Sequence, residues 1–161
     1  MAGFHTKTFM KHDDYMTPKY AWENIQHLIP KDKVIWEAFY GDGKSGEYLK
    51  ELGFNVIHKD IDFYENNLGD IIVSNPPFSD KNKLLTRLKD LDKPFIILLP
   101  QNAINVKAMR DHFKKNLQLI IPRKRIQFIK NGNEINNKCN FDCFYFCYKM
   151  NFKESVIFLE K

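Results

Sequence analysis

The sequence has few of the features that mark fibrous, membrane-spanning or disulfide-stapled proteins. Its 161 residues include only 7 glycines and 7 prolines, which excludes a collagen-like repeat. No apolar run approaches the 18 or so residues that cross a bilayer, and the run at residues 95–99 predicts a buried strand instead. The first residues lack a long apolar stretch, so we expect no signal peptide and no secretion.

Cysteine is also scarce. The three cysteines, Cys139, Cys143 and Cys147, are odd in number and no second pair of ligands accompanies them, so they predict neither a disulfide framework nor a zinc site. We expect Cys143 and Cys147 as small buried residues on one face of a strand, in the cytoplasm or another reducing compartment. The five histidines show no ligand spacing either, so the sequence predicts no bound metal.

The charge balance is mildly basic. There are 25 Lys and Arg residues against 20 Asp and Glu residues, a net charge of +5. This excess is compatible with a polyanionic partner but does not establish one. The cluster of Arg123, Lys124 and Arg125 is the candidate for nucleic-acid contact, and an ordinary solvated surface explains it equally well.

The chain has the length of a single domain, residues 1–161, and no repeat or linker divides it. Helix and strand signals alternate, which predicts an α/β fold with a mostly parallel sheet, helices on both faces and a late antiparallel hairpin at the edge. Thr17 is expected to cap the first helix, with Pro18 in its first turn. The expected strands are residues 33–37, 54–58, 70–74, 94–99, 117–121, 125–129 and 142–149, and the expected helices are residues 19–28, 45–52, 81–89 and 105–115.

The first expected strand ends in a glycine turn, Gly41-Asp-Gly43, which lets the backbone approach a ligand closely. Asp60 lies 19 residues after Gly41, where dinucleotide folds hold ribose hydroxyls, although a solvated loop carboxylate is the alternative. Residues 38–45 also fit a relaxed phosphate loop, so a nucleoside-triphosphatase stays an alternative. It is disfavoured because no acidic residue ends the strands at 71–73 and 95–99 to hold Mg²⁺.

The sharpest signal is Asn75-Pro76-Pro77-Phe78, directly after a buried strand. Two consecutive prolines hold the backbone extended and rigid. Asn75 adds a side-chain carbonyl and Phe78 a flat apolar face, and together they form a socket for an exocyclic amine on a planar ring. An ordinary strand-ending loop is the alternative.

These motifs resemble the S-adenosylmethionine-dependent amino-methyltransferases, in particular the N6-adenine methyltransferases of nucleic acids. In that family Asn-Pro-Pro-Phe lies at the target amine, and Asp-x-Phe-x-Gly-x-Gly forms the cofactor turn. The turn is matched from Glu37 to Gly43, with Glu37 one methylene longer than the usual aspartate. The resemblance covers roughly residues 14–149 and implies a Rossmann-like class I methyltransferase fold.

The resemblance also implies the roles of single residues. The N-terminal arm, residues 1–17, closes over the cofactor through Thr17-Pro18, Asp60 holds the ribose, and Asp62-Phe63 reads the adenine. Phe141 lies near the flipped base. The cofactor-binding residues implied in this way are Tyr15, Thr17, Pro18, Glu37, Phe39, Gly41, Gly43, Asp60, Asp62 and Phe63.

The chemistry implied is the transfer of a methyl group to the N6 amine of adenine, with DNA favoured over RNA. Asn75 and the carbonyl of Pro76 accept the two N–H bonds of the amine, and Phe78 stacks on the base. No separate target-recognition domain is visible, so we expect low sequence specificity or recognition supplied by a partner subunit or a homodimer. RNA adenine methylation, protein glutamine methylation and a non-catalytic cofactor-binding subunit stay open, although the glutamine enzymes usually carry Tyr in place of Phe78.

Overall fold

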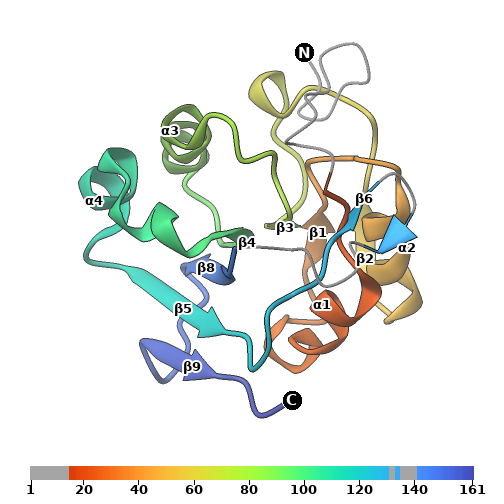
Figure 1. Cartoon of the computed structure of the whole chain (residues 1–161). Coiled ribbons are helices and arrows are strands. Elements are labelled where there is room, and N and C mark those ends of the chain that lie inside the picture. The colour runs from red at the N-terminus through yellow and green to blue at the C-terminus, as the bar shows by residue number, and fades with distance from the viewer. Residues whose placement is uncertain (1–14, 131–132, 135–140) are drawn as a thin grey trace.

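The computed structural model describes residues 15–130, 133–134 and 141–161. It is an α/β fold in which helices cover both faces of one seven-stranded sheet (Figure 1). The strands of this sheet are β1 (Val34–Trp36), β2 (Asn55–Ile57), β3 (Ile71–Ser74), β4 (Phe95–Pro100), β5 (Leu117–Ile121), β8 (Cys143–Tyr148) and β9 (Val156–Phe158). A separate ribbon pairs β6 (Ile129–Lys130) with β7 (Asn133–Glu134).

The helices are mostly short. The α-helices are α1 (Lys19–Glu23), α2 (Lys44–Glu51), α3 (Lys81–Leu91) and α4 (Lys107–Phe113). The 3₁₀ helices are η3 (Gln26–Leu28), η4 (Phe63–Glu65) and η5 (Gln101–Asn105). No described helix has the length and apolar character needed to cross a membrane.

The strand order of the main sheet is β2-β1-β3-β4-β8-β5-β9. Strands β1 to β4 pair in parallel, β8 runs antiparallel to both of its neighbours, and β9 pairs in parallel with β5. This arrangement confirms the predicted Rossmann-like α/β fold, a mostly parallel sheet flanked by helices. It also means that β1, β2, β3, β4 and β5 all point the same way, so their carboxyl ends share one edge of the sheet.

The predicted antiparallel hairpin forms between β5 and β8, but its expected place at the sheet edge is wrong. Strand β8 lies inside the sheet, between β4 and β5, and β9 forms the edge. The six residues of β8 are almost all buried, which suits a central strand covered on both faces, whereas β9 is largely exposed.

The core has two parts, one on each face of the sheet. Alternate residues of β4 divide between them: Ile96 and Leu98 pack with α1 and α2, while Phe95, Ile97 and Leu99 pack with α3 and α4. This period of two is that of a strand whose successive side chains point to opposite faces. Figure 1 shows α3 and α4 on one side of the sheet and α1 and α2 on the other.

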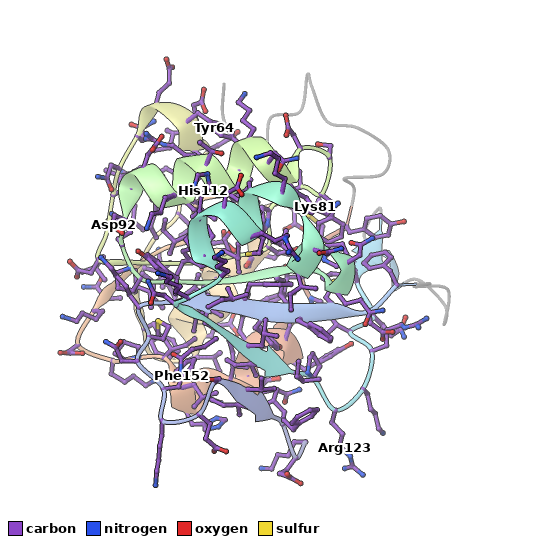
Figure 2. The ribbon with its side chains drawn as sticks, turned by 90° about the vertical axis from the view of Figure 1, so that its left-hand side faces the viewer. Tyr64, Lys81, Asp92, His112, Arg123 and Phe152 are labelled. Carbon is purple, nitrogen blue, oxygen red and sulfur yellow. The ribbon has the colours of Figure 1, made fainter. Side chains whose placement is uncertain are left out.

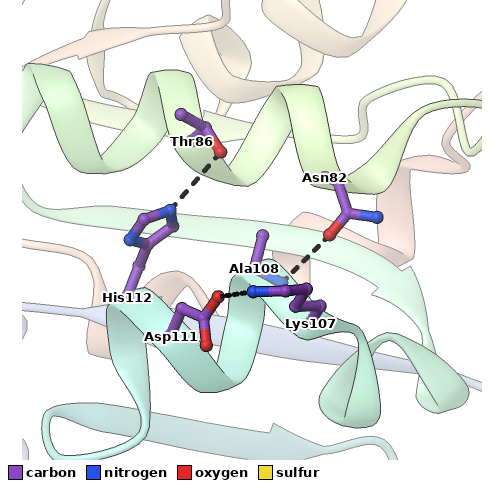
Figure 3. Close-up of polar contacts among 6 residues, drawn as sticks. All are labelled: Asn82, Thr86, Lys107, Ala108, Asp111 and His112. Atoms are coloured by element: carbon purple, nitrogen blue, oxygen red, sulfur yellow. Dashed lines mark hydrogen bonds and ion pairs between the residues drawn. The ribbon is translucent and has the colours of Figure 1, made fainter.

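Helices α3 and α4 are joined by polar contacts as well as by the core (Figure 3). The side-chain oxygen of Asn82 accepts a hydrogen bond from the backbone N–H of Ala108 in the first turn of α4. One turn further along α3, Thr86 contacts the His112 ring at 3.4 Å. Because the first N–H groups of a helix lack partners within it, the contact from Asn82 satisfies one of them and sets where α4 begins.

Two predicted elements at the carboxyl edge differ from the structure. The helix expected at residues 19–28 divides into α1 and η3, and the cap expected from Thr17 is wrong, because Pro18 occupies the N-cap position without a side-chain hydrogen bond. The strand expected at 125–129 is reduced to β6, which begins only at Ile129 and pairs with β7. Ile129 also bridges to Met16 of the N-terminal segment through two backbone hydrogen bonds of 2.7 and 2.9 Å. The N-terminal segment therefore runs beside residues 126–129.

The cysteine prediction is confirmed where it can be followed. Cys143 and Cys147 are free, buried and in the same part of the core, whereas Cys139 lies outside the described residues. Burial in apolar surroundings raises the pKa of the Cys147 thiol, so the thiol stays neutral as a packing residue.

The packing of α2 on β2 generates a stability prediction. A Cβ at Gly46 would overlap the His58 ring, which follows β2, so Gly46→Ala forces the helix and the strand apart. We expect the free energy of unfolding, measured with urea, to fall by about 1–3 kcal/mol. Lys50→Ala, at an exposed position of the same helix, is the control and should change it by less than about 0.5 kcal/mol. Equal stability of the two variants would contradict this packing.

Candidate active site

The candidate site lies at the carboxyl edge of the sheet, between β1 and β3. The chain continues from β1 to β2 on one side and from β3 to β4 on the other, so the strand order reverses at this point. Open α/β sheets bind ligands at such a switch point. The glycine turn follows β1 here, and Asn75 follows β3 directly.

The glycine turn has the geometry that the sequence predicts. Gly41 and Gly43 have φ angles of 62° and 84°, in the left-handed region that favours glycine. A Cβ at Gly43 would also lie 2.8 Å from the Tyr40 hydroxyl oxygen. Gly43 is the N-cap residue of α2, so the turn leads straight into a helix N-terminus at the edge of the site.

A buried carboxyl group lies beneath this turn. Glu37 is 1% exposed, and its two oxygens accept hydrogen bonds from the hydroxyls of Ser45 and Ser74 and from the backbone N–H of Phe39 at 3.1 Å. The indole N–H of Trp22 in turn donates to the Ser45 oxygen at 2.8 Å. We call Trp22, Glu37, Ser45 and Ser74 the carboxyl network. Sequence reasoning placed Glu37 in the site but missed the other three.

The pKa of Glu37 is raised to about 7. Burial away from water is the main cause, and the bonds from Ser45, Ser74 and Phe39 partly oppose it. The contacts persist in either protonation state, because a serine hydroxyl can donate or accept.

Asn75 is the second polar group at the switch point. Its side-chain N–H donates to the carbonyl of Tyr15 at 3.3 Å, which orients the amide. Its side-chain oxygen is buried and finds no hydrogen-bond partner among the described residues. An orphaned buried acceptor costs about 1–3 kcal/mol, and at a switch point such a group is available to a ligand donor.

Four aromatic rings surround this end of the site. Phe78 meets Phe141 edge-on at a centroid distance of 5.5 Å, and Phe141 contacts Tyr15 at 5.6 Å and stacks near Phe128 at 5.9 Å. We call Tyr15, Phe78, Phe128 and Phe141 the aromatic cluster. Phe128 was missed from the sequence, where only its place in an expected strand was noted.

The acidic loop after β2 is less uniform than predicted. Asp60 is exposed, three residues beyond β2, and is available to a ligand. Asp62 caps η4 by accepting from the Tyr64 N–H at 2.8 Å. Phe63 has no exposed surface and packs against Phe39 at 4.7 Å, so it supports the glycine turn from the core. Its adenine contact stays a prediction that requires the ring to become exposed.

The glycine turn, the N-terminal segment and Asn75 enclose a small pocket. Its lining residues are Tyr15, Met16, Thr17, Glu37, Phe39, Tyr40, Gly41, Asp42, Ser45 and Asn75. Hydroxyl, amide and carboxyl groups meet apolar surface in this lining. The pocket volume is about 10 Å³, so any ligand larger than a water molecule requires the lining to move apart. Ser45, which a phosphate loop would place on Mg²⁺, instead donates to Glu37.

The predicted nucleic-acid contacts are of two kinds. Arg123 and Lys124 are exposed beyond the carboxyl end of β5, and Figure 2 shows the Arg123 side chain pointing outward. Arg125 instead forms a two-pronged ion pair with Asp142, at 2.9 and 3.1 Å. Asp142 directly follows Phe141, so this pair adjoins the aromatic cluster. Residues 1–14 of the predicted N-terminal arm lie outside the described residues.

No cluster of metal-binding side chains occurs in the part of the chain that is described.

The raised pKa of Glu37 generates a pH prediction. The folded state binds the proton of this carboxyl more tightly than the unfolded chain does, so its stabilising effect is present at low pH and is lost as pH rises through about 7. We expect the free energy of unfolding of the unmodified protein, minus that of Glu37→Gln, to fall by up to about 3 kcal/mol as the pH rises from about 5 to 8. Parallel pH profiles of the two proteins would contradict it.

Comparison with known proteins points to one class of enzyme. No protein-family model matches the chain. The sequence is similar to the type II methyltransferase M.EcoRI of Escherichia coli, with 29% identity over 114 residues. This match covers 71% of the chain but only 30% of that protein, so the chain spans less than a third of its relative. A structural match to TrmN from Thermus thermophilus covers 80% of this chain and 40% of that one, at 14% identity and a TM-score of 0.33. The fold assignment therefore rests on the strand order and not on this match. The sequence similarity is thus to a methyltransferase, as the motifs predicted.

Proposed function

We propose that this chain is an S-adenosylmethionine-dependent methyltransferase that acts on the N6 amine of adenine in DNA. The observation that carries the proposal is the buried side-chain oxygen of Asn75, which has no partner in the described part of the chain. It lies directly after β3 at the switch point, beside an aromatic cluster. An acceptor with an aromatic face nearby suits an amine on a planar ring. The similarity to a type II methyltransferase supports the reaction class.

When bound, S-adenosylmethionine supplies a methyl group activated by its sulfonium centre. The work of the chain is to prepare the nucleophile, because an aryl amine shares its lone pair with the ring. The side-chain oxygen of Asn75 and the carbonyl of Pro76 each accept a hydrogen bond from one N–H group of the amine. These bonds draw the nitrogen toward tetrahedral geometry, which frees the lone pair for attack. Positioning and electrostatics carry this step, and the product proton leaves to solvent.

The residues proposed to hold the cofactor come from three loops. The turn at Gly41 and Gly43 lets the backbone approach it, and the exposed carboxylate of Asp60 accepts from its ribose hydroxyls. Tyr15 and Thr17 line the pocket, Pro18 follows them directly, and this segment moves to admit the cofactor. Phe39 and Phe63 pack against each other in the core and support the turn from that side.

The substrate base reaches Asn75 only when it is unstacked. A base inside a duplex is enclosed on both faces, so it is flipped out or taken from a single strand. Phe78 and Phe141 are half-buried beside Asn75 and offer rings for stacking. Arg123 and Lys124 lie on the same edge and provide phosphate contacts. Recognition of sequence is left to a partner subunit or a second copy.

Transfer of labelled methyl groups tests the proposal. The intact chain is incubated with single-stranded DNA, duplex DNA, RNA and protein side by side. We expect labelled N6-methyladenine in DNA, with single strands favoured. Asn75→Ala should lower turnover at least about 10²-fold with nearly unchanged cofactor affinity, because the lost acceptor acts mainly in the transition state.

Asn116→Ala is the matched control, because Asn116 is exposed after α4 and far along the chain from the site. It should leave turnover unchanged. Label in RNA or on protein glutamine would redirect the substrate, and cofactor binding without any transfer would identify a non-catalytic subunit. Normal turnover of Asn75→Ala would remove the central argument for an aminomethyltransferase.

The different settings of Arg123 and Arg125 generate a second prediction. Arg123→Ala should weaken DNA binding about equally on unrelated sequences and flatten the dependence on salt by about one phosphate contact. Arg125→Ala should also lower turnover, because Asp142 loses its partner beside Phe141. Lys153→Ala is the control, since residues just before β9 lie at the opposite edge of the sheet. Binding titrations at several salt concentrations check this, and a steeper loss for Lys153→Ala would contradict it.

A further inference from the structure

We propose that Glu37 is a positioning residue that ties the glycine turn to Asn75, in place of the cofactor contact that the resemblance implies. The inference rests on the proposed function, since it concerns how that site is assembled. Its basis is the carboxyl network, in which one buried side chain joins the ends of β1 and β3 to α2.

The two oxygens of Glu37 reach in different directions. One accepts from Ser45 in the first turn of α2, directly behind Gly43. The other accepts from Ser74, the residue before Asn75, and from the N–H of Phe39 at the start of the glycine turn. The carboxyl group thus bridges the turn proposed for the cofactor and the strand end proposed for the target amine.

When Glu37 is ionised, the direction of each serine hydrogen bond is set by a further donor. The Trp22 indole N–H donates to the Ser45 oxygen at 2.8 Å, so the Ser45 proton is directed to Glu37. In the same way, the Phe39 N–H also approaches the Ser74 oxygen at 3.3 Å, and the Ser74 proton is directed to Glu37. Glu37 borders the pocket, but its oxygens have internal donors and only 1% of its surface is exposed, so it offers little to a ligand.

The length of the side chain fits this role. The related motif carries aspartate, and the additional methylene of Glu37 extends the carboxyl group by about 1.5 Å. That extra reach lets one carboxyl group bridge two serines that belong to different elements. Aspartate in the same place would release at least one of them.

Ser74 provides the decisive test position. It is completely buried and does not line the pocket, so it touches neither cofactor nor base. Any effect of Ser74 on cofactor affinity therefore passes through Glu37 and Phe39. Cys147 in β8 is a matched control, because it is an equally buried small residue on a strand and lies outside the network.

The experiment measures the cofactor dissociation constant by calorimetry and the turnover by methyl transfer for Glu37→Asp, Ser74→Ala, their double variant and Cys147→Ala. We expect Glu37→Asp to weaken cofactor binding about fivefold and lower turnover at least about tenfold, so the conservative residue does not rescue activity. Ser74→Ala should weaken cofactor binding by a similar factor. The double variant should lie within about twofold of Glu37→Asp alone, because both changes break one bridge. Cys147→Ala should leave both quantities unchanged.

Normal affinity and turnover in Glu37→Asp would overturn the inference and restore Glu37 as a cofactor contact. So would additive effects of Glu37→Asp and Ser74→Ala. Absence of methyl transfer by the unmodified chain would instead count against the proposed function. In that event amide hydrogen exchange still decides the inference. Ser45 bonds the Glu37 oxygen that Phe39 does not contact, so Ser45→Ala should lower the protection of the Phe39 amide at least about tenfold only if Glu37 forms the bridge. Unchanged protection would refute the bridge.

Discussion

The arrangement at the switch point depends on the burial of one carboxyl group. Placing Glu37 away from water is unfavourable unless donors surround it, and the donors come from α2, from the end of β3 and from the glycine turn. These elements must therefore approach Glu37 closely for the chain to fold. Trp22 brings α1 into the same network through Ser45. The requirement to satisfy one buried group thus fixes α1 and the end of β3 against the glycine turn and α2, which lie elsewhere in the sequence.

Asn75 and Glu37 differ in how their buried side-chain oxygens are satisfied. Both lie at the ends of neighbouring strands and both are shielded from water, yet every oxygen of Glu37 has a donor, whereas the side-chain oxygen of Asn75 has none among the residues described. A fully satisfied polar group stabilises the fold, and an unsatisfied one is tolerated where a ligand completes it. Two prolines after Asn75 restrict the backbone and so keep the position of the acceptor fixed. Rigid surroundings and an acceptor without a hydrogen-bond partner are what a preorganised site requires.

Much of this architecture was predictable from sequence because it is local. The apolar runs of β3 and β4 and the turn at Gly41 and Gly43 follow from composition and backbone conformation. The place of β8 inside the sheet was not predictable, because it depends on pairing with strands far away in the chain. The partners of Glu37 were hidden for the same reason, since serine carries no signal until folding brings it to a carboxyl group. The pairing of Arg125 with Asp142 likewise separates it from Arg123, which its neighbouring position in sequence did not show.

The N-terminal segment links the two halves of the site. The carbonyl of Tyr15 accepts from the Asn75 amide, while Met16 pairs with Ile129 next to Phe128. The same three residues, Tyr15 to Thr17, line the small pocket above the glycine turn. A displacement of this segment would act directly on the bond that orients Asn75. The lining of the pocket on the glycine side and the orientation of Asn75 on the aromatic side thus depend on one short stretch of backbone.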